Sequence, residues 1–154
     1  MTDGAKHNLD LSRGGTGLKL LMFYAPEFWF KTTYKVLETA EDTECEQRVR
    51  DTVVVFVHAE AEDEANASKI LTKMVKNIKW LAGKFACKSV VLHSFSHLAT
   101  SKSSPEFAHQ ILIDARRRLT HIGFTVEMTP FGYLHEFSLH VTGESLGRVF
   151  KEIS

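Results

Sequence analysis

The sequence is poor in cysteine, in net charge and in long apolar runs, and each shortage argues against a class of protein. Its two cysteines, Cys45 and Cys87, lack CxxC spacing, which argues against a disulfide framework and a cysteine zinc site. Lys and Arg together number 19, as do Asp and Glu, whereas domains that coat nucleic acid are usually basic. No apolar run approaches the ~18 residues of a membrane span, and residues 1–10 lack the apolar segment of a secretory signal. We therefore expect a cytoplasmic protein that does not enter a membrane.

The overall composition and length are typical of one globular domain. The chain has 154 residues, of which 44% are hydrophobic and 25% are charged. A chain of this length buries roughly 68–70% of the surface of its unfolded form, which is enough for one sizeable core. Residues 1–17 hold closely spaced glycines and no apolar period, so we expect a flexible leader there and a single domain over residues 18–154.

The spacing of apolar residues predicts a mixed α/β (α+β) fold. Short apolar or alternating runs predict strands at 18–24, 28–36, 52–58, 88–93, 124–127 and 135–142, with a break at Ala25-Pro26. Apolar residues at three- and four-residue steps predict helices at 62–85, 104–122 and 144–153. An excess of acidic side chains between Glu38 and Glu64 is interpreted as a solvated loop around the strand at 52–58.

The order of these elements indicates how they are connected. In the middle of the chain, strand, helix, strand and helix follow one another, which implies a βαβ crossover and at least one parallel strand pair. Ser104 as a cap, Pro105 in the first turn and Gly123 as a left-handed stop mark the ends of the second helix. We expect a mixed sheet with two long helices and a short C-terminal helix.

The sequence contains no local catalytic signature, since GxSxG, HExxH, Walker and dinucleotide-binding patterns are all missing. In α/β sheets, ligands collect beyond the carboxyl ends of the parallel strands. The segment 93–100 follows such a strand and supplies His93, His97 and several hydroxyl groups. By themselves these histidines are more typical of caps or surface hydrogen bonds than of a functional site. Their four-residue spacing, on no helix and without a third ligand, does not favour zinc.

Two short motifs at matching separations connect the chain with a known family. They are F-x-H-L at Phe95–Leu98 and P-F-G-Y at Pro130–Tyr133. Together with residues 53–60, they form a match in order and spacing over residues 18–153. In these features the chain resembles the archaeal threonyl-tRNA synthetase editing domain, whose fold is shared with the D-aminoacyl-tRNA deacylases. Because no catalytic domain of a synthetase follows in this sequence, we expect a stand-alone version.

The resemblance implies an aminoacyl-tRNA editing deacylase that hydrolyses the ester of mischarged tRNA, here seryl-tRNA(Thr), in trans. Water attacks the ester at the terminal ribose, and the family needs no metal and no cofactor for this step. Binding alone separates serine from threonine by one methyl group, worth ~1–3 kcal/mol, so a second site that excludes the larger residue raises fidelity. The implied partners are the 3′ end of an aminoacyl-tRNA, threonyl-tRNA synthetase and a second copy of the chain in a homodimer.

Carried over position by position, the resemblance implies two catalytic residues, His97 and His135. His97 matches a family histidine that contacts the adenosine and the seryl group. His135 stands where the family has a lysine, and its imidazole can still donate a hydrogen bond or take up a proton near neutral pH. The implied substrate-binding residues are Phe95, Ser96, Pro130, Phe131, Gly132, Tyr133, Leu134, Glu144 and Arg148.

Three positions depart from the family pattern. Leu134 replaces a tyrosine, His135 replaces the lysine, and the glutamate of the last predicted helix falls at Arg148, one turn from Glu144. The loss of a permanent cation at His135 leaves two other functions open. One is a non-catalytic module that binds a tRNA end or a synthetase, and the other is a deacylase for another substrate such as a D-aminoacyl-tRNA. The alternative for His135 itself is a strand residue near the core.

Overall fold

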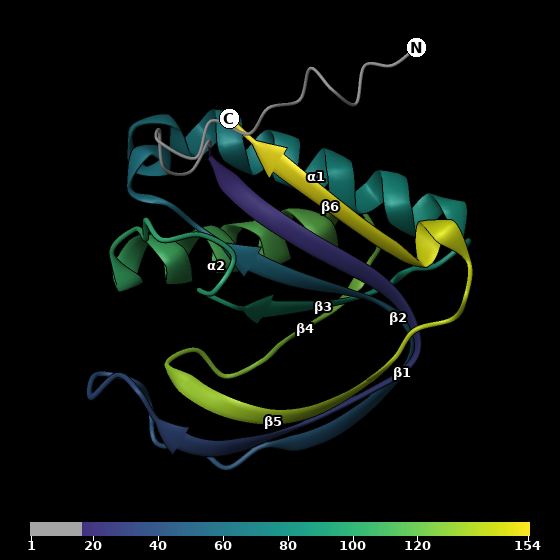
Figure 1. Ribbon diagram of the computed structural model, residues 1–154, viewed down its shortest axis with the longest axis horizontal. Helices are drawn as coiled ribbons and strands as arrows, with labels where there is room; N and C mark the ends of the chain where they lie inside the picture. Colours follow the sequence, from purple (N-terminus) through teal and green to yellow (C-terminus); the bar gives the residue numbers. More distant parts are fainter. Residues whose placement is uncertain (1–16) are drawn as a thin grey trace.

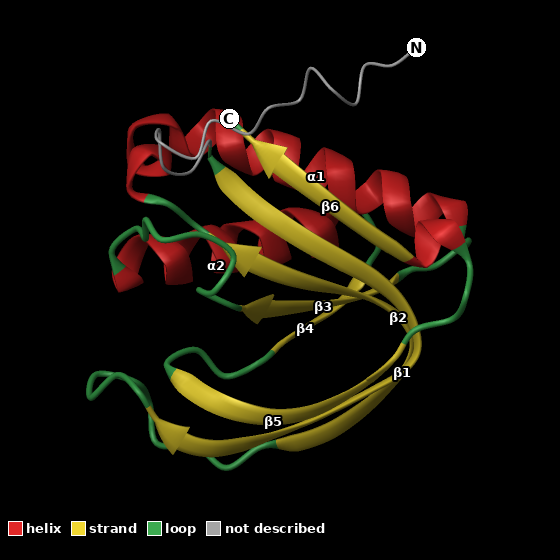
Figure 2. Ribbon diagram, in the orientation of Figure 1, coloured by secondary structure: helices red, strands yellow, loops and turns green. Residues whose placement is uncertain are grey.

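The computed structural model describes residues 17–154, which form a six-stranded mixed sheet with two helices (Figure 1, Figure 2). The strand order is β4-β3-β2-β1-β5, and β6 also pairs with β1. The strands are β1 (Leu18–Lys35), β2 (Glu46–His58), β3 (Ser89–Ser94), β4 (Thr125–Met128), β5 (Tyr133–His140) and β6 (Arg148–Ile153). The helices are α1 (Ala67–Lys84) and α2 (Pro105–His121), with 3-10 turns η3 (Ala61–Asn66) and η4 (Ser145–Gly147). The predicted leader at 1–17 lies outside the described residues, apart from Gly17.

Two crossovers confirm the predicted βαβ connection. β2 runs parallel to β3 and β3 parallel to β4, while β1 is antiparallel to β2, β5 and β6. The helices α1 and α2 connect the parallel strands and lie on the same face of the sheet (Figure 2). The expected α+β fold with a mixed sheet and two long helices is therefore confirmed. Within residues 17–154, no helix is long and apolar enough to cross a membrane.

The two long helices form where their sequence patterns indicate. The 3-10 turn η3 replaces the first turn predicted for α1, and one apolar stripe of α1 packs on the sheet: Ile70, Leu71, Met74, Val75, Ile78, Leu81 and Ala82. At the start of α2, the hydroxyl group of Ser104 accepts a hydrogen bond from the N–H of Phe107 at 3.2 Å, and Pro105 occupies the first turn. Beyond its end, Gly123 has φ +101. The predicted cap and stop of α2 are confirmed.

The prediction of two strands around Ala25-Pro26 was wrong, because β1 is one continuous strand of 18 residues. Proline cannot donate a ladder hydrogen bond, yet pairing with β2 resumes directly after it, at Glu27 and Arg50. β2 is also irregular at this point, since Asp51, next to Arg50, has φ +48. The long partner strand therefore keeps β1 extended across the proline.

β1 changes its second neighbour at this same place, which curls the sheet. Its first part, up to Phe23, pairs with β6, and its second part, from Glu27, pairs with β5. The second part curves away from the helices, so β5 and α1 lie on opposite sides of the molecule (Figure 1). A second apolar cluster fills the curl, separate from the core under the helices: Ala25, Phe28, Phe30, Val54, Phe56 and Val91. The sheet is therefore packed on both faces.

The predicted C-terminal helix was also wrong. The short turn η4 leads into β6, which pairs with β1 from Leu18 opposite Ile153 to Phe23 opposite Arg148. Of the apolar residues in this segment, Ile153 is buried, whereas Phe150 is 49% exposed. The strand forms because the first part of β1 has backbone N–H and C=O groups along one edge, and β6 satisfies them.

Candidate active site

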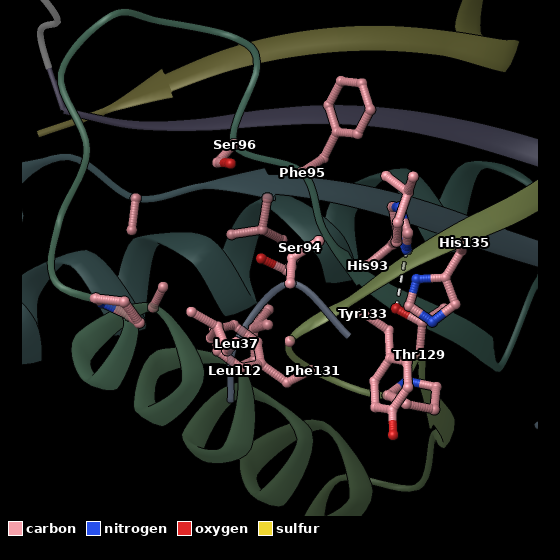
Figure 3. Close-up of a pocket in the computed structure, with 18 of the residues that line it drawn as sticks. Leu37, His93, Ser94, Phe95, Ser96, Leu112, Thr129, Phe131, Tyr133 and His135 are labelled. Atoms are coloured by element: carbon pink, nitrogen blue, oxygen red, sulfur yellow. Dashed lines mark hydrogen bonds between the residues drawn. The ribbon is translucent and has the colours of Figure 1, made fainter. Parts of the chain in front are cut away.

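A cavity of about 400 Å³ opens between the loop after β3, the start of α2 and the turn that leads into β5 (Figure 3). Both motifs singled out in the sequence contribute to its lining. The predicted site residues that line it are Phe95, Ser96, His97, Pro130, Phe131, Gly132, Tyr133, Leu134 and His135. The two motifs, distant in the chain, therefore meet at one cavity.

Parallel pairing places the first motif at the carboxyl end of β3. Val57 of β2 pairs with Ser94, and the N–H of Phe95 donates to the carbonyl of Val57 at 2.9 Å. The loop 95–104 then runs past the end of β2, where the N–H of Ser103 donates to the carbonyl of Ala59 at 3.0 Å. The cavity thus lies beyond the carboxyl ends of parallel strands, where ligands of α/β sheets bind.

The second motif sits in a turn that requires glycine. Gly132 has φ +86, and a Cβ at this position would stand 2.7 Å from the Cβ of Ala40. Its carbonyl accepts hydrogen bonds from the N–H groups of Val36 and Leu37, at 2.8 and 3.2 Å. The Tyr133 hydroxyl group is bonded to backbone atoms of residues 41 and 43, at 2.7 and 2.9 Å. The segment that follows β1 therefore holds the turn in place.

Two imidazole rings stand beside one another in the cavity wall (Figure 3). The ring centroids of His93 and His135 are 5.4 Å apart, and Nδ1 of His93 lies 2.9 Å from Oγ1 of Thr129. Burial, and to a smaller extent the nearby His135, together lower the pKa of His93 to about 3. Burial also lowers the pKa of His135. Both rings are therefore neutral at pH 7.

His135 keeps one ring nitrogen uncommitted. It lies on β5 opposite Thr32 of β1, and its ring centroid is 5.9 Å from that of Phe30. Among the described residues, its Nε2 is buried and has no hydrogen-bond partner. A buried polar atom without a partner costs about 1–3 kcal/mol, so a water or ligand hydroxyl group that reaches Nε2 gains a favourable bond there. His135 is thus a strand residue near the core that also lines the cavity.

Exposed polar side chains line the cavity beside His93, which is buried, and His135, which is half-buried. His97 is exposed, and its ring packs edge to face against Phe95 with centroids 5.0 Å apart. Lys102, on the same loop, is also exposed. Within residues 17–154 it is the one cavity-lining side chain with a permanent charge, and no carboxylate joins it in the lining. Such a cavity suits a neutral polar ligand or one that carries an anionic group.

Sequence reasoning gave no ligand role to Ser94, Lys102 or Thr129, all of which line the cavity. His93 was expected at the end of a parallel strand, as a cap or surface hydrogen bonder more than as a functional or zinc-binding residue. Residues 17–154 contain no group of three or more His, Cys, Asp or Glu side chains placed to hold a metal ion. Three of these four positions had a signal in the sequence: His93 and Ser94 end β3, and Thr129 directly precedes the P-F-G-Y motif. Lys102 had no signal, because the path of an irregular loop is not encoded in a local pattern.

Two predicted substrate-binding residues, Glu144 and Arg148, do not line the cavity. Glu144 precedes η4, and Arg148 opens β6 opposite Phe23. The guanidinium group of Arg148 donates to the carbonyl of Thr142 at 2.5 Å. The helix expected to place these two residues one turn apart does not form, and β6 pairs with a part of β1 that β5 does not reach. The structure thus places both residues away from this cavity, and their contact with substrate stays a prediction.

A curled mixed sheet, two crossover helices on one face and a cavity at the parallel strand ends define a fold of the D-aminoacyl-tRNA deacylase-like class. A solved structure, the c-Myc DNA Unwinding Element Binding Protein, matches this chain with a TM-score of 0.61 and 11% identity. The match covers 88% of this chain and 99% of that protein. At this identity the likeness shows a shared fold, which confirms the fold expected from the motifs.

The sequence also identifies the family. The model of the archaea-specific editing domain of threonyl-tRNA synthetase matches residues 18–153, and the chain belongs to this family. The threonine–tRNA ligase of Methanosphaera stadtmanae is 31% identical over 140 residues, which are 89% of this chain and 23% of that protein. The ligase of Thermococcus onnurineus is 27% identical over 139 residues, which are 88% of this chain and 22% of that protein. The chain thus spans less than a quarter of the length of these relatives.

Proposed function

We propose that the protein is an aminoacyl-tRNA editing deacylase that hydrolyses seryl-tRNA(Thr) in trans. The observation that carries this proposal is the meeting of the F-x-H-L and P-F-G-Y motifs at one cavity of about 400 Å³. Pockets for small ligands range over about 300–1,000 Å³, so the cavity suits the aminoacylated terminal nucleoside, with the rest of the tRNA outside. Contact with the tip alone also suits a chain whose 19 basic residues are matched by 19 acidic ones.

The reaction requires an oriented water and donors for the developing oxyanion. The water oxygen bonds to the ester carbonyl carbon, the bond from this carbon to the ribose oxygen breaks, and the ribose oxygen receives the proton. Nε2 of neutral His135, which is buried and has no partner among the described residues, is suited to accept a hydrogen bond from that water. His97 would contact the ligand from the loop after β3, and Phe131 forms an apolar part of the cavity wall.

One observation favours a second function. His135 is neutral at the position where the family pattern has a lysine, so the site has lost a cation that would face the reacting ester. A site altered in this way could bind an aminoacylated tRNA end, or a synthetase, without catalysis. It could also hydrolyse another acyl group, a D-aminoacyl group among them. The neighbouring position is altered as well, because Leu134 is 46% exposed at the cavity where the pattern has a tyrosine.

We further propose that the protein acts in the cytoplasm as a homodimer and cooperates with threonyl-tRNA synthetase. Exposed apolar side chains on β6 and α1 support self-association, since Phe150 is 49% and Trp80 40% exposed. Within residues 17–154, β6 pairs with β1 alone, so no strand of the described part of the chain pairs with its other edge. Light scattering that gives the mass of one chain at assay concentrations would contradict the homodimer.

The direct test follows ester loss from seryl-, threonyl- and D-aminoacyl-tRNA. Editing predicts fast release of serine and slow release of threonine from tRNA(Thr). His97→Ala should lower the rate, whereas His121→Ala, at an exposed histidine that ends α2 and does not line the cavity, should not. Equal decay of every ester with and without the protein contradicts the deacylase. Saturable binding of the same RNAs would then support the non-catalytic module.

His135→Lys tests the main departure from the family pattern. We expect this variant to lower kcat, because a protonated lysine cannot accept the hydrogen bond from the attacking water that we assign to Nε2 of His135. The measurement is the kcat for seryl-tRNA(Thr), with His140→Lys, at an exposed β5 histidine outside the cavity, as the control. A raised kcat would instead show that a cation close to the developing oxyanion matters more than a neutral acceptor at position 135.

A further inference from the structure

His58 is a buried histidine at the end of β2, and both of its ring nitrogens bond to the loop 95–104. The side chain is 1% exposed and does not itself line the cavity. Its Nδ1 lies 3.1 Å from the backbone nitrogen of Leu98. Its Nε2 lies 2.7 Å from the carbonyl oxygen of Ser101. The ring therefore joins β2 to the loop that forms one wall of the cavity.

The chemistry of the two backbone partners determines the tautomer of this ring. A backbone N–H can only donate a hydrogen bond, and a backbone carbonyl can only accept one. Nδ1 of His58 must therefore be the bare acceptor for Leu98, and Nε2 must carry the hydrogen that is donated to Ser101. A neutral imidazole offers this acceptor and this donor at fixed positions on a rigid ring. Neither an apolar side chain nor a purely anionic one supplies both.

The two bonds hold the middle of an irregular loop whose ends are tied differently. The N–H groups of Phe95 and Ser103 donate to the carbonyls of residues 57 and 59, at 2.9 and 3.0 Å. These outer bonds involve backbone atoms alone and do not depend on the side chain at position 58. Between them, His97 directly precedes one residue that the ring binds, and Lys102 directly follows the other. Both of these side chains line the cavity.

We propose that His58 is a positioning residue of the candidate active site, which places His97 and Lys102 at the cavity by clamping the backbone of Leu98 and Ser101. The kinetic consequence of this clamp rests on the proposed deacylase function. The clamp itself does not, because it is defined by hydrogen bonds within the chain.

Three substitutions separate the two bonds. His58→Asn places an amide oxygen near the position of Nδ1 and keeps an acceptor for Leu98. His58→Gln places an amide nitrogen near the position of Nε2 and keeps a donor for Ser101. His58→Phe keeps a ring and removes both bonds. Thermal unfolding of the full chain checks that each variant is folded. If the Phe variant does not fold, the comparison of the Asn and Gln variants still tests the clamp.

Hydrogen exchange and NMR test the clamp without any substrate. In the wild-type chain, the nitrogen chemical shifts of the His58 ring should report the Nε2–H tautomer. The Leu98 amide should exchange about tenfold faster in the Gln and Phe variants than in the wild type and the Asn variant. The Phe95 amide is the internal control, because its bond to residue 57 is present in all of them. An Nδ1–H tautomer, or unchanged Leu98 exchange in the Gln and Phe variants, would overturn the proposal.

Deacylation of seryl-tRNA(Thr) tests what the clamp does for the site. The Gln and Phe variants of His58 should lose about tenfold in kcat with a smaller change in KM, because misplaced groups affect the reacting geometry most. The Asn variant should keep most of the wild-type kcat. If the wild type is active and all three variants keep its kcat, the positioning role is wrong. If the wild type hydrolyses no ester, the proposed function is wrong. The hydrogen exchange of Leu98 and the tautomer of His58 then still test whether the clamp exists.

Discussion

Gly132→Ala should destabilise the protein and disturb the cavity, through two causes that the structure separates. Gly132 has φ +86, where a residue with a side chain is strained by about 1–2 kcal/mol. The new Cβ would also stand 2.7 Å from the Cβ of Ala40 and 3.3 Å from that of Leu37. Carbon atoms pack best at about 3.5–4.0 Å, so the neighbours must move, at an overpacking cost of about 1–3 kcal/mol. The free energy of unfolding should therefore fall by about 2–5 kcal/mol in total.

Two other glycines supply matched controls. Gly123 has φ +101 but nothing within 4 Å of an added Cβ, so Gly123→Ala carries the backbone strain alone. Gly83 lies inside α1 with nothing within 4 Å of an added Cβ, so Gly83→Ala should stabilise the helix by up to about 1 kcal/mol. The expected order of stability is Gly83→Ala above the wild type, then Gly123→Ala, then Gly132→Ala.

Urea unfolding followed by circular dichroism measures these stabilities, and deacylation by the same variants reports on the cavity. At ~2–4 °C per kcal/mol, Gly132→Ala should melt roughly 4–20 °C below the wild type. It should also lose activity, since Gly132 lines the cavity while Gly83 and Gly123 do not. Equal stability of Gly132→Ala and Gly123→Ala would refute the close approach to Ala40, and with it the reason given for glycine in this turn.

Three further predictions concern pH, charge and capping. The pKa of His93, about 3 when folded, lies below its unfolded value of 6.5, so the unfolded chain binds more protons and stability falls as the pH drops below 6.5. Urea titrations should show a loss of about 2–3 kcal/mol between pH ~6.5 and ~4.5 that His93→Gln lacks, and parallel pH slopes would contradict this. Lys102→Met should raise KM for the tRNA substrate and make KM less dependent on salt, while Lys69→Met on α1 should change neither. An unaltered KM would show that Lys102 does not contact the substrate. Ser104→Ala removes the acceptor for the Phe107 N–H and should cost about 0.5–2 kcal/mol in chemical unfolding, so undiminished stability would show that this cap contributes nothing.

The long helices could be predicted because their signals are local. The apolar period of α1 and the cap and stop of α2, at Ser104 and Gly123, act over a few residues, and the structure places both helices accordingly. The order of strands and helices then implied the parallel pairs β2–β3 and β3–β4. Local propensity and tertiary packing agree over this part of the chain, and the prediction is correct there.

Two errors in the fold, at Pro26 and at the C-terminal segment, lie where a distant strand decides. The proline at position 26 does not end β1, because β2 pairs with the strand on both sides of it. The last residues form β6 instead of a helix, because the first part of β1 provides an edge to pair with. Over so short a segment, a helical period and a strand alternation are hard to distinguish, and the available hydrogen-bond partner makes the choice.

By itself, the sequence determined the two long helices, the family and the two motifs that meet at the cavity. The tertiary structure alone decided that His93 and His135 stand together as neutral rings, that Lys102 joins the lining, and that Glu144 and Arg148 do not. The same holds for the clamp of His58 on Leu98, which links residues 40 positions apart. Burial, pKa and long-range hydrogen bonds arise from contacts between distant parts of the chain, and no local pattern of residues encodes them.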